Sequence, residues 1–172
     1  MNVKRKTSSR HSAQTKVKVA ASSQSAAESR SAEAQVTKLI GQYAPAHFKL
    51  ITAIRRSLRK RLPTAHEVVY EYRNQGAVVI SFSPSGQGYE GVLAVRADAD
   101  GLKLYFTQGR QLPDPEKLLQ GSANARWILV EGTSTLTRPG VTSLIDQAIA
   151  CNKVPFANLG RGSVVIRSAS SK

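Results

Sequence analysis

Residues 68–82 read VVYEYRNQGAVVISF, and this stretch decides the fold class. Apolar and aromatic residues recur at every second position along residues 68–73 and again along residues 78–82. A period of two is the pattern of β-strands, whose side chains alternate between two faces. Residues 74–76, Asn-Gln-Gly, supply a turn between the two runs. The stretch therefore predicts a β-hairpin.

The hairpin continues into a meander of antiparallel strands. Asp100-Gly101 is a typical tight turn between two such strands. Pro113 begins a short helical turn before the last strand. Further strands are predicted at residues 89–97, 102–107 and 127–131.

Helical periodicity replaces the strand pattern on both sides of the meander. Apolar residues recur at spacings of three and four in residues 33–43, and again between Pro45 and Pro63. Residues 141–150 show one apolar helical face after Pro139. This order of elements predicts an α+β fold. We expect an antiparallel meander sheet of about five strands, with two N-terminal helices and one C-terminal helix packed on it.

The composition divides the chain into three parts. Residues 1–31 are rich in Ser, Ala, Lys, Arg and Gln and contain no aromatic residue. They cannot bury enough surface to offset the entropy of ordering, so we predict a disordered basic tail; an organellar transit peptide is the alternative. Residues 33–150 form the domain, and residues 151–172 form a C-terminal extension with a candidate short edge strand at residues 164–166.

Positive charge is the strongest signal outside the predicted core. The chain holds 25 Lys and Arg against 11 Asp and Glu, which gives a formal net charge of +14. Such a field attracts polyanions at low ionic strength, and added salt weakens the attraction. The alternative is solubility alone, since cations commonly lie on solvated helix faces and near helix C-termini. The candidate polyanion-binding residues are Lys4, Arg5, Lys6, Arg55, Arg56, Arg59, Lys60 and Arg61.

Four aromatic residues in the predicted strands have two interpretations. Aromatic rings on a sheet can stack on nucleic-acid bases. Aromatic residues at alternate strand positions more often belong to a core. The residues concerned are Tyr70, Tyr72, Tyr105 and Trp127.

No residue set in the sequence predicts a catalytic, cofactor-binding or metal site. Cys151 is the single cysteine, which excludes an internal disulfide, and no Cys/His cluster has metal-ligand spacing. An enzyme would require Cys151, a histidine and a carboxylate to converge in the fold. Residues 86–91 spell GxGxxG, but a strand rather than a helix follows them, which favours a flexible loop over a nucleotide site.

The sequence predicts a cytoplasmic protein that does not engage a membrane. Its apolar runs fall far short of the roughly 20 residues that a membrane-spanning helix needs. The N-terminus lacks the apolar region of a secretory signal. A reducing compartment suits a chain with one cysteine.

The run LYFTQG at residues 104–109, followed by LPDP at 112–115 and LLQGS at 118–122, is similar to the second half of YdhG-like domains. This is a family of uncharacterised bacterial domains, and the two helices before a hairpin fit the same plan. The resemblance covers about Val36 to Ile149. It implies an α+β fold of the YdhG/YjbR/CyaY type, distantly frataxin-like.

The resemblance also implies iron handling as one function, because frataxin-like binding of iron uses carboxylates clustered on an early helix and the adjacent strand. Here the matching helix holds Lys49 and the basic residues between 55 and 61, with no acidic residue, which counts against iron. We therefore expect a non-catalytic binding or interaction module whose central feature is a concave sheet face. The alternative is salt-dependent association with nucleic acid or another polyanion through the tail and residues 55–61.

Overall fold

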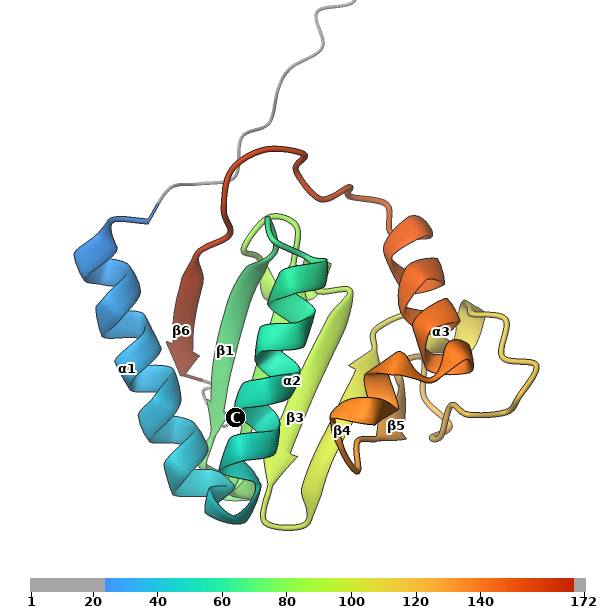
Figure 1. Ribbon diagram of the computed structural model, residues 1–172, viewed down its shortest axis with the longest axis horizontal. Coiled ribbons are helices and arrows are strands. Elements are labelled where there is room, and N and C mark those ends of the chain that lie inside the picture. The colour runs from blue at the N-terminus through green and yellow to red at the C-terminus, as the bar shows by residue number, and fades with distance from the viewer. Residues whose placement is uncertain (1–23, 169–172) are drawn as a thin grey trace, which may run out of the picture.

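One β-sheet and three α-helices make up two layers in the described part of the chain (Figure 1). The computed structural model describes residues 24–168. The α-helices are α1 (Ala26–Tyr43), α2 (Phe48–Arg61) and α3 (Pro139–Ala150). The strands are β1 (His66–Tyr72), β2 (Ala77–Ser83), β3 (Leu93–Asp98), β4 (Gly101–Phe106), β5 (Arg126–Leu129) and β6 (Val164–Ser168).

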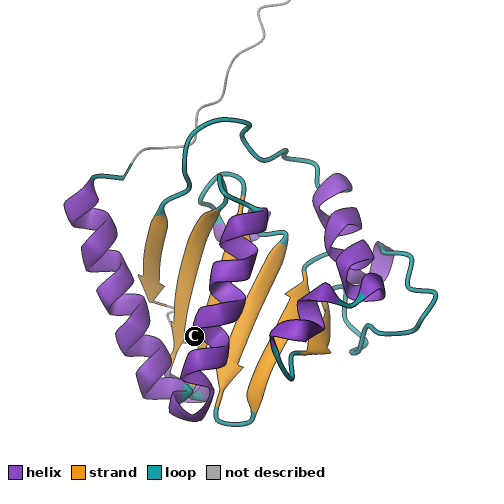
Figure 2. Cartoon of the chain, in the orientation of Figure 1, coloured by secondary structure: helices purple, strands orange, loops and turns teal. Residues whose placement is uncertain are grey.

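The sheet order is β5-β4-β3-β2-β1-β6. Strands β1 to β5 form the predicted meander, in which each strand pairs antiparallel with the next. All three α-helices lie on the same side of the sheet (Figures 1 and 2). The α+β class predicted from the sequence is confirmed.

The first helix begins earlier than predicted. Ser25 caps it, because the Oγ of Ser25 accepts the backbone N–H of Glu28 at 3.2 Å and the carboxylate of Glu28 accepts the N–H of Ser25 at 3.0 Å. Residues 26–31, which we predicted to be disordered, are therefore the first turns of α1. The Ser-x-x-Glu spacing was the signal in the sequence for this start.

The sheet has six strands instead of about five. β6 pairs parallel with β1 at the edge of the sheet, and the N–H of Glu67 donates to the carbonyl of Ser163 at 2.9 Å. The side-chain amide of Gln24 makes two hydrogen bonds to the backbone of Val164, at 3.0 and 3.1 Å. Val164 is buried in the core. Part of the predicted C-terminal extension is thus integral to the domain.

The segment predicted to form a short helical turn after Pro113 contains one hydrogen-bonded turn, in which the N–H of Lys117 donates to the carbonyl of Asp114 at 3.1 Å, but no helix. The carboxylate of Asp114 accepts the backbone N–H groups of Leu118 and Leu119 at 2.9 and 2.8 Å, which holds this segment as an irregular loop. Short 3₁₀-helices occur instead on either side, at Gly109–Gln111 and Thr133–Thr137.

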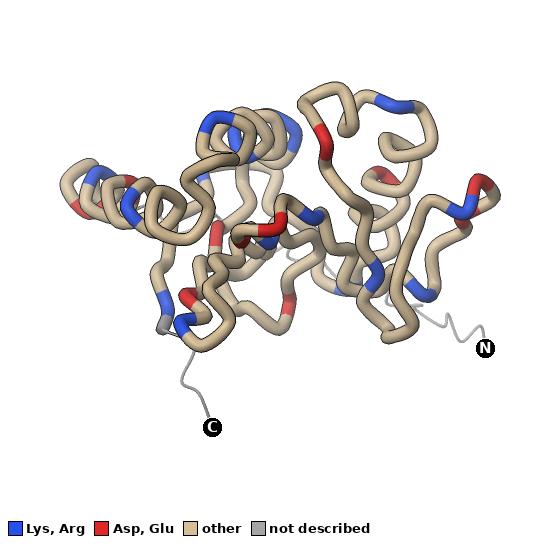
Figure 3. The backbone as a smooth tube through the Cα atoms, turned by 90° about the horizontal axis from the view of Figure 1, so that it is seen from below, with Lys and Arg blue, Asp and Glu red and all other residues tan. Residues whose placement is uncertain are grey.

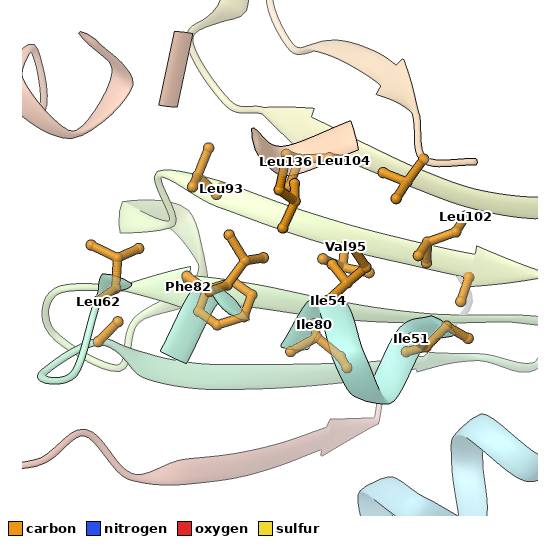
Figure 4. Close-up of a cluster of buried hydrophobic side chains, with 14 of the residues drawn as sticks. Ile51, Ile54, Leu62, Ile80, Phe82, Leu93, Val95, Leu102, Leu104 and Leu136 are labelled. Carbon is orange, nitrogen blue, oxygen red and sulfur yellow. The ribbon is translucent and has the colours of Figure 1, made fainter. Parts of the chain in front are cut away.

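The core lies between the helices and the sheet face that they cover. Figure 4 shows Ile51 and Ile54 of α2 beside Ile80 and Phe82 of β2, all of them at most 1% exposed. Alternate strand residues enter this core, so their neighbours in sequence point to the other side of the sheet. No helix within residues 24–168 has the length and apolarity to cross a membrane.

Candidate functional site

The arginines of α2 point in two directions. Arg55 is buried, and together with Arg59 it lies against Glu33 of α1 and Glu67 of β1. The Nη1 of Arg55 lies 2.7 Å from a carboxylate oxygen of Glu33, and its Nε donates to Glu67. Arg59 donates to the same two carboxylates. These four residues, the buried charge network, join α1, α2 and β1.

Opposite charges stabilise the ionised forms within the buried charge network. Burial alone would raise the pKa of Glu33, but hydrogen bonds from Arg59 and Arg55 outweigh it and hold the pKa below its ordinary value. Burial alone would lower the pKa of Arg59, whereas the charge of Glu67 and the bonds to both carboxylates raise it. Arg55 is therefore buried and unable to contact phosphates, and Arg59, whose side chain is 33% exposed, is committed to the same two carboxylates.

Of the cationic residues predicted on α2, only some face solvent. Arg61 is paired with Asp146 of α3 at 2.5 Å. Arg56 and Lys60 are exposed, and Lys49 lies on the same side of the helix. Figure 3 shows basic positions along α2 in the helix layer. Three other candidates lie outside the described residues: Lys4, Arg5 and Lys6.

Tyr70, Tyr72, Tyr105 and Trp127 lie on the sheet face that no α-helix of residues 24–168 covers, here called the open face. Val69 of β1 belongs to the core under the helices, so Tyr70 beside it points to the open face. Strand pairing aligns the residues of this face in rows across the sheet. One row is Val68, Ser81, Ala94, Tyr105 and Trp127, and the next is Tyr70, Val79, Arg96, Lys103 and Leu129.

The middle of the open face is a hollow of about 540 Å³. Its floor consists of Val79, Ser81 and Ala94 on β2 and β3, with Tyr70 on one side and Tyr105 on the other. Strands lie about 4.8 Å apart, so β1 and β4 are roughly 14 Å apart. The concave sheet face expected from the sequence corresponds to this hollow.

An aromatic pair flanks the hollow on each side. The ring centroids of Tyr70 and Tyr72 are 6.3 Å apart, and those of Tyr105 and Trp127 are 6.5 Å apart. All four residues are half-buried. The rings thus pack against neighbours while part of each remains accessible to a ligand.

Three cations that the sequence analysis did not single out lie on the open face, one of them Arg167, which pairs with Tyr70 in the register of β1 and β6. The Nζ of Lys103 is 4.7 Å from the centre of the Trp127 ring, a cation–π contact. Arg96 pairs with Asp98 at 3.2 Å and donates to Gln75 at 3.0 Å. Counting residues outward from the predicted turn at residues 100–101 places Arg96 opposite Lys103, as observed. This count was the signal in the sequence that these two cations lie on the same face.

The glycines of the GxGxxG segment have a packing role. A Cβ on Gly88 would lie 1.5 Å from the hydroxyl of Tyr70, and one on Gly91 would lie 2.1 Å from the Oγ of Ser81. Gly86 has a φ of +76°, a left-handed conformation that favours glycine. The segment therefore folds closely against the edge of the open face, which explains its glycines without a nucleotide.

The described residues do not bring Cys151 together with a histidine and a carboxylate. Cys151 is exposed at the end of α3 and borders a hollow of about 90 Å³. The residues that line this hollow include Thr107, Gln108 and Asn152, but no histidine, aspartate or glutamate. Within residues 24–168, no group of three or more His, Cys, Asp or Glu residues is placed to hold a metal ion.

His66 is buried at the start of β1 and connects that strand to the segment before β6. Its Nδ1 accepts the backbone N–H of Ser163 at 3.1 Å and lies 2.7 Å from the Oγ of the same residue. An Nδ1 that accepts a backbone N–H carries no proton, so the neutral ring holds β6 in place. Burial lowers the pKa of His66 below its ordinary value.

This arrangement predicts a loss of stability in mild acid. The unfolded chain takes up a proton on His66 before the folded chain does, so the contribution of His66 is fully present above about pH 6.5 and declines as the pH falls. We expect the unfolding free energy to fall less between pH 7 and pH 5 in His66→Asn, which keeps an acceptor but does not titrate. Denaturant unfolding at both pH values measures this difference. Equal declines in the two proteins would contradict the assignment.

Comparison of the chain with protein-family models, curated proteins and solved structures finds no match.

Proposed function

We propose that this protein is a non-catalytic binding module that associates with nucleic acid or another polyanion through its positive charge. The observation that carries the proposal is the distribution of ion pairs. Most acidic residues within 24–168 are paired with arginines, whereas most lysines and arginines there belong to no ion pair. The surplus charge therefore remains available at the surface, as on the outer side of α2.

Segments beyond the domain add to this charge. Residues 1–23 hold six lysines and arginines and no acidic residue. Each phosphate that a cation neutralises releases a counterion, so affinity should fall steeply with salt. The absence of a Cys-His-carboxylate set among the described residues supports a binding role over a catalytic one.

A relation to YdhG-like domains is part of this proposal. The order of two helices, an antiparallel meander and a C-terminal helix supports it. Fold likeness alone gives little information on function, so the binding proposal rests on the charges.

The proposal predicts salt-dependent binding of nucleic acid. Residues 1–23 and the exposed cations of α2 should contribute separately to this binding. Deleting residues 1–23 leaves Gln24 and Ser25, which make the hydrogen bonds at the start of α1. We expect this deletion to weaken binding and to reduce the slope of log affinity against log salt by about 0.7 to 0.9 for each phosphate that the protein no longer neutralises. Replacing Lys49, Arg56 and Lys60 with glutamine should reduce the slope further. Fluorescence anisotropy of a labelled oligonucleotide over a salt series measures both effects.

The matched control is Arg138→Gln. Arg138 is exposed but is paired with Glu131 at 3.3 Å, so its loss should leave the salt slope nearly unchanged. The proposal fails if full-length protein does not bind nucleic acid at low salt, or if neither the deletion nor the α2 triple variant changes the affinity.

A further inference from the structure

We infer that the open face is a stacking platform for single-stranded nucleic acid, on which Tyr70, Tyr72, Tyr105 and Trp127 contact bases. This inference rests on the proposed function. It adds that the preferred nucleic acid is single-stranded and that the open face is the surface that distinguishes a single strand from a duplex. The sequence left the roles of these rings undecided between core and stacking. Their placement away from the helices favours stacking.

The shape of the open face suits planar groups. The floor of the hollow is built from short side chains, Val79, Ser81 and Ala94, whereas the rings on either side are large. Each ring is half-buried and packs against a second ring, so little side-chain entropy remains to be lost on binding. No α-helix within residues 24–168 lies on this side (Figure 1).

The charge of the open face selects an anionic partner. Lys103 lies over Trp127, where it can reach a phosphate beside a stacked base. Asp98 is countered by Arg96, and no carboxylate lines the hollow. With a formal net charge of +14 for the chain, this complementarity favours a nucleic acid over an apolar or basic peptide.

The aromatic rings restrict the partner to unpaired strands. Bases in a duplex are stacked on one another, so their faces are inaccessible to a flat sheet. In a single strand the bases can separate and stack on tyrosine and tryptophan with little regard for sequence. The cations of α2 act on either form. The positive charge therefore gives affinity for single strands and duplexes alike, and the open face should add a preference for single strands.

The test uses the full-length protein with a labelled single strand of about 12 nucleotides, close to the site sizes of known single-strand binders, and a duplex of equal length. Trp127 is the only tryptophan of the chain, so quenching of its fluorescence reports stacking on the open face directly. We expect quenching by the single strand and little by the duplex. Tyr70→Leu combined with Tyr105→Leu, which keeps apolar bulk but removes two rings, should weaken single-strand binding at least about tenfold. Duplex binding should change less than about twofold.

Two matched variants separate stacking from loss of structure. Tyr43→Leu removes a tyrosine at the end of α1, on the helix side of the sheet, and it should leave binding unchanged. Tyr105→Phe keeps the ring and should bind the single strand as tightly as the unaltered protein. Equal affinity for single strand and duplex, without quenching, would overturn this inference and leave the proposed function intact. No binding of either form at low salt would overturn both.

Discussion

Replacing Glu67 with alanine is expected to lower the free energy of unfolding by about 3 to 5 kcal/mol. Glu67 is 2% exposed, and its carboxylate accepts hydrogen bonds from Arg55 and Arg59. Its removal leaves the buried guanidinium of Arg55 with Glu33 as its remaining carboxylate partner. Small domains are stable by only about 5 to 15 kcal/mol, so this loss is a large share of the total. Denaturant unfolding followed by far-UV circular dichroism measures it.

Two further variants test the cause of this loss. Glu131→Ala removes an ion pair whose two side chains are 65% and 55% exposed, and it should change the unfolding free energy by less than about 1 kcal/mol. Arg55→Met combined with Glu67→Met removes both buried charges, and it should be less destabilising than Glu67→Ala alone. If Glu67→Ala costs no more than Glu131→Ala, the buried charge network does not hold the helices on the sheet.

The central part of the fold could be predicted because its information is local. The period of two in residues 68–82, the Asn-Gln-Gly turn and the Asp100-Gly101 turn each specify a strand or a hairpin within a few residues. Consecutive hairpins in turn determine the antiparallel order of β1 to β4. No long-range contact is required for these steps, whereas β5 reaches β4 only across the connection formed by residues 107–125.

Strand β6 was harder to predict because its partners are distant in sequence. It pairs with β1, almost 100 residues earlier, and its outer side meets Gln24. A short run of three apolar residues specifies neither a parallel pairing nor a place in the sheet order. The sequence indicated a strand there, but not that it completes the domain.

The candidate site was also only partly predictable from local sequence patterns. The sequence identified the aromatic residues, but Val69 and Tyr70 are both suited to a core, so the pattern did not say which face the helices cover. For the arginines, the helical spacing in the sequence does carry the signal. Arg55 follows Ile51 by four residues and precedes Leu58 by three, which places it on the buried side, whereas Arg56 lies about 100° away around the helix.

Substituting alanine for Gly162 is expected to displace β6 from the sheet. A Cβ at this position would lie 1.7 Å from the carbonyl oxygen of Ala65 and 2.3 Å from its carbonyl carbon. These are backbone atoms directly before β1, so they cannot move aside without disturbing that strand. The hydrogen bonds of Ser163 to His66 and Glu67 lie immediately beyond Gly162 and should be lost with the displacement.

The expected cost of Gly162→Ala is at the upper end of the roughly 1 to 3 kcal/mol that overpacking usually brings, because the edge strand β6 and its buried Val164 leave with it. Faster hydrogen exchange at β6 and along the newly exposed edge of β1 would accompany the loss of stability. Gly132→Ala is the matched control, since the nearest atom to its Cβ would be 3.8 Å away, and it should be close to neutral. If the two glycine variants are equally stable, β6 adapts to a different path. Because Tyr70 lies on β1, a displaced β6 should also lower single-strand affinity, while charge-driven binding of duplex persists.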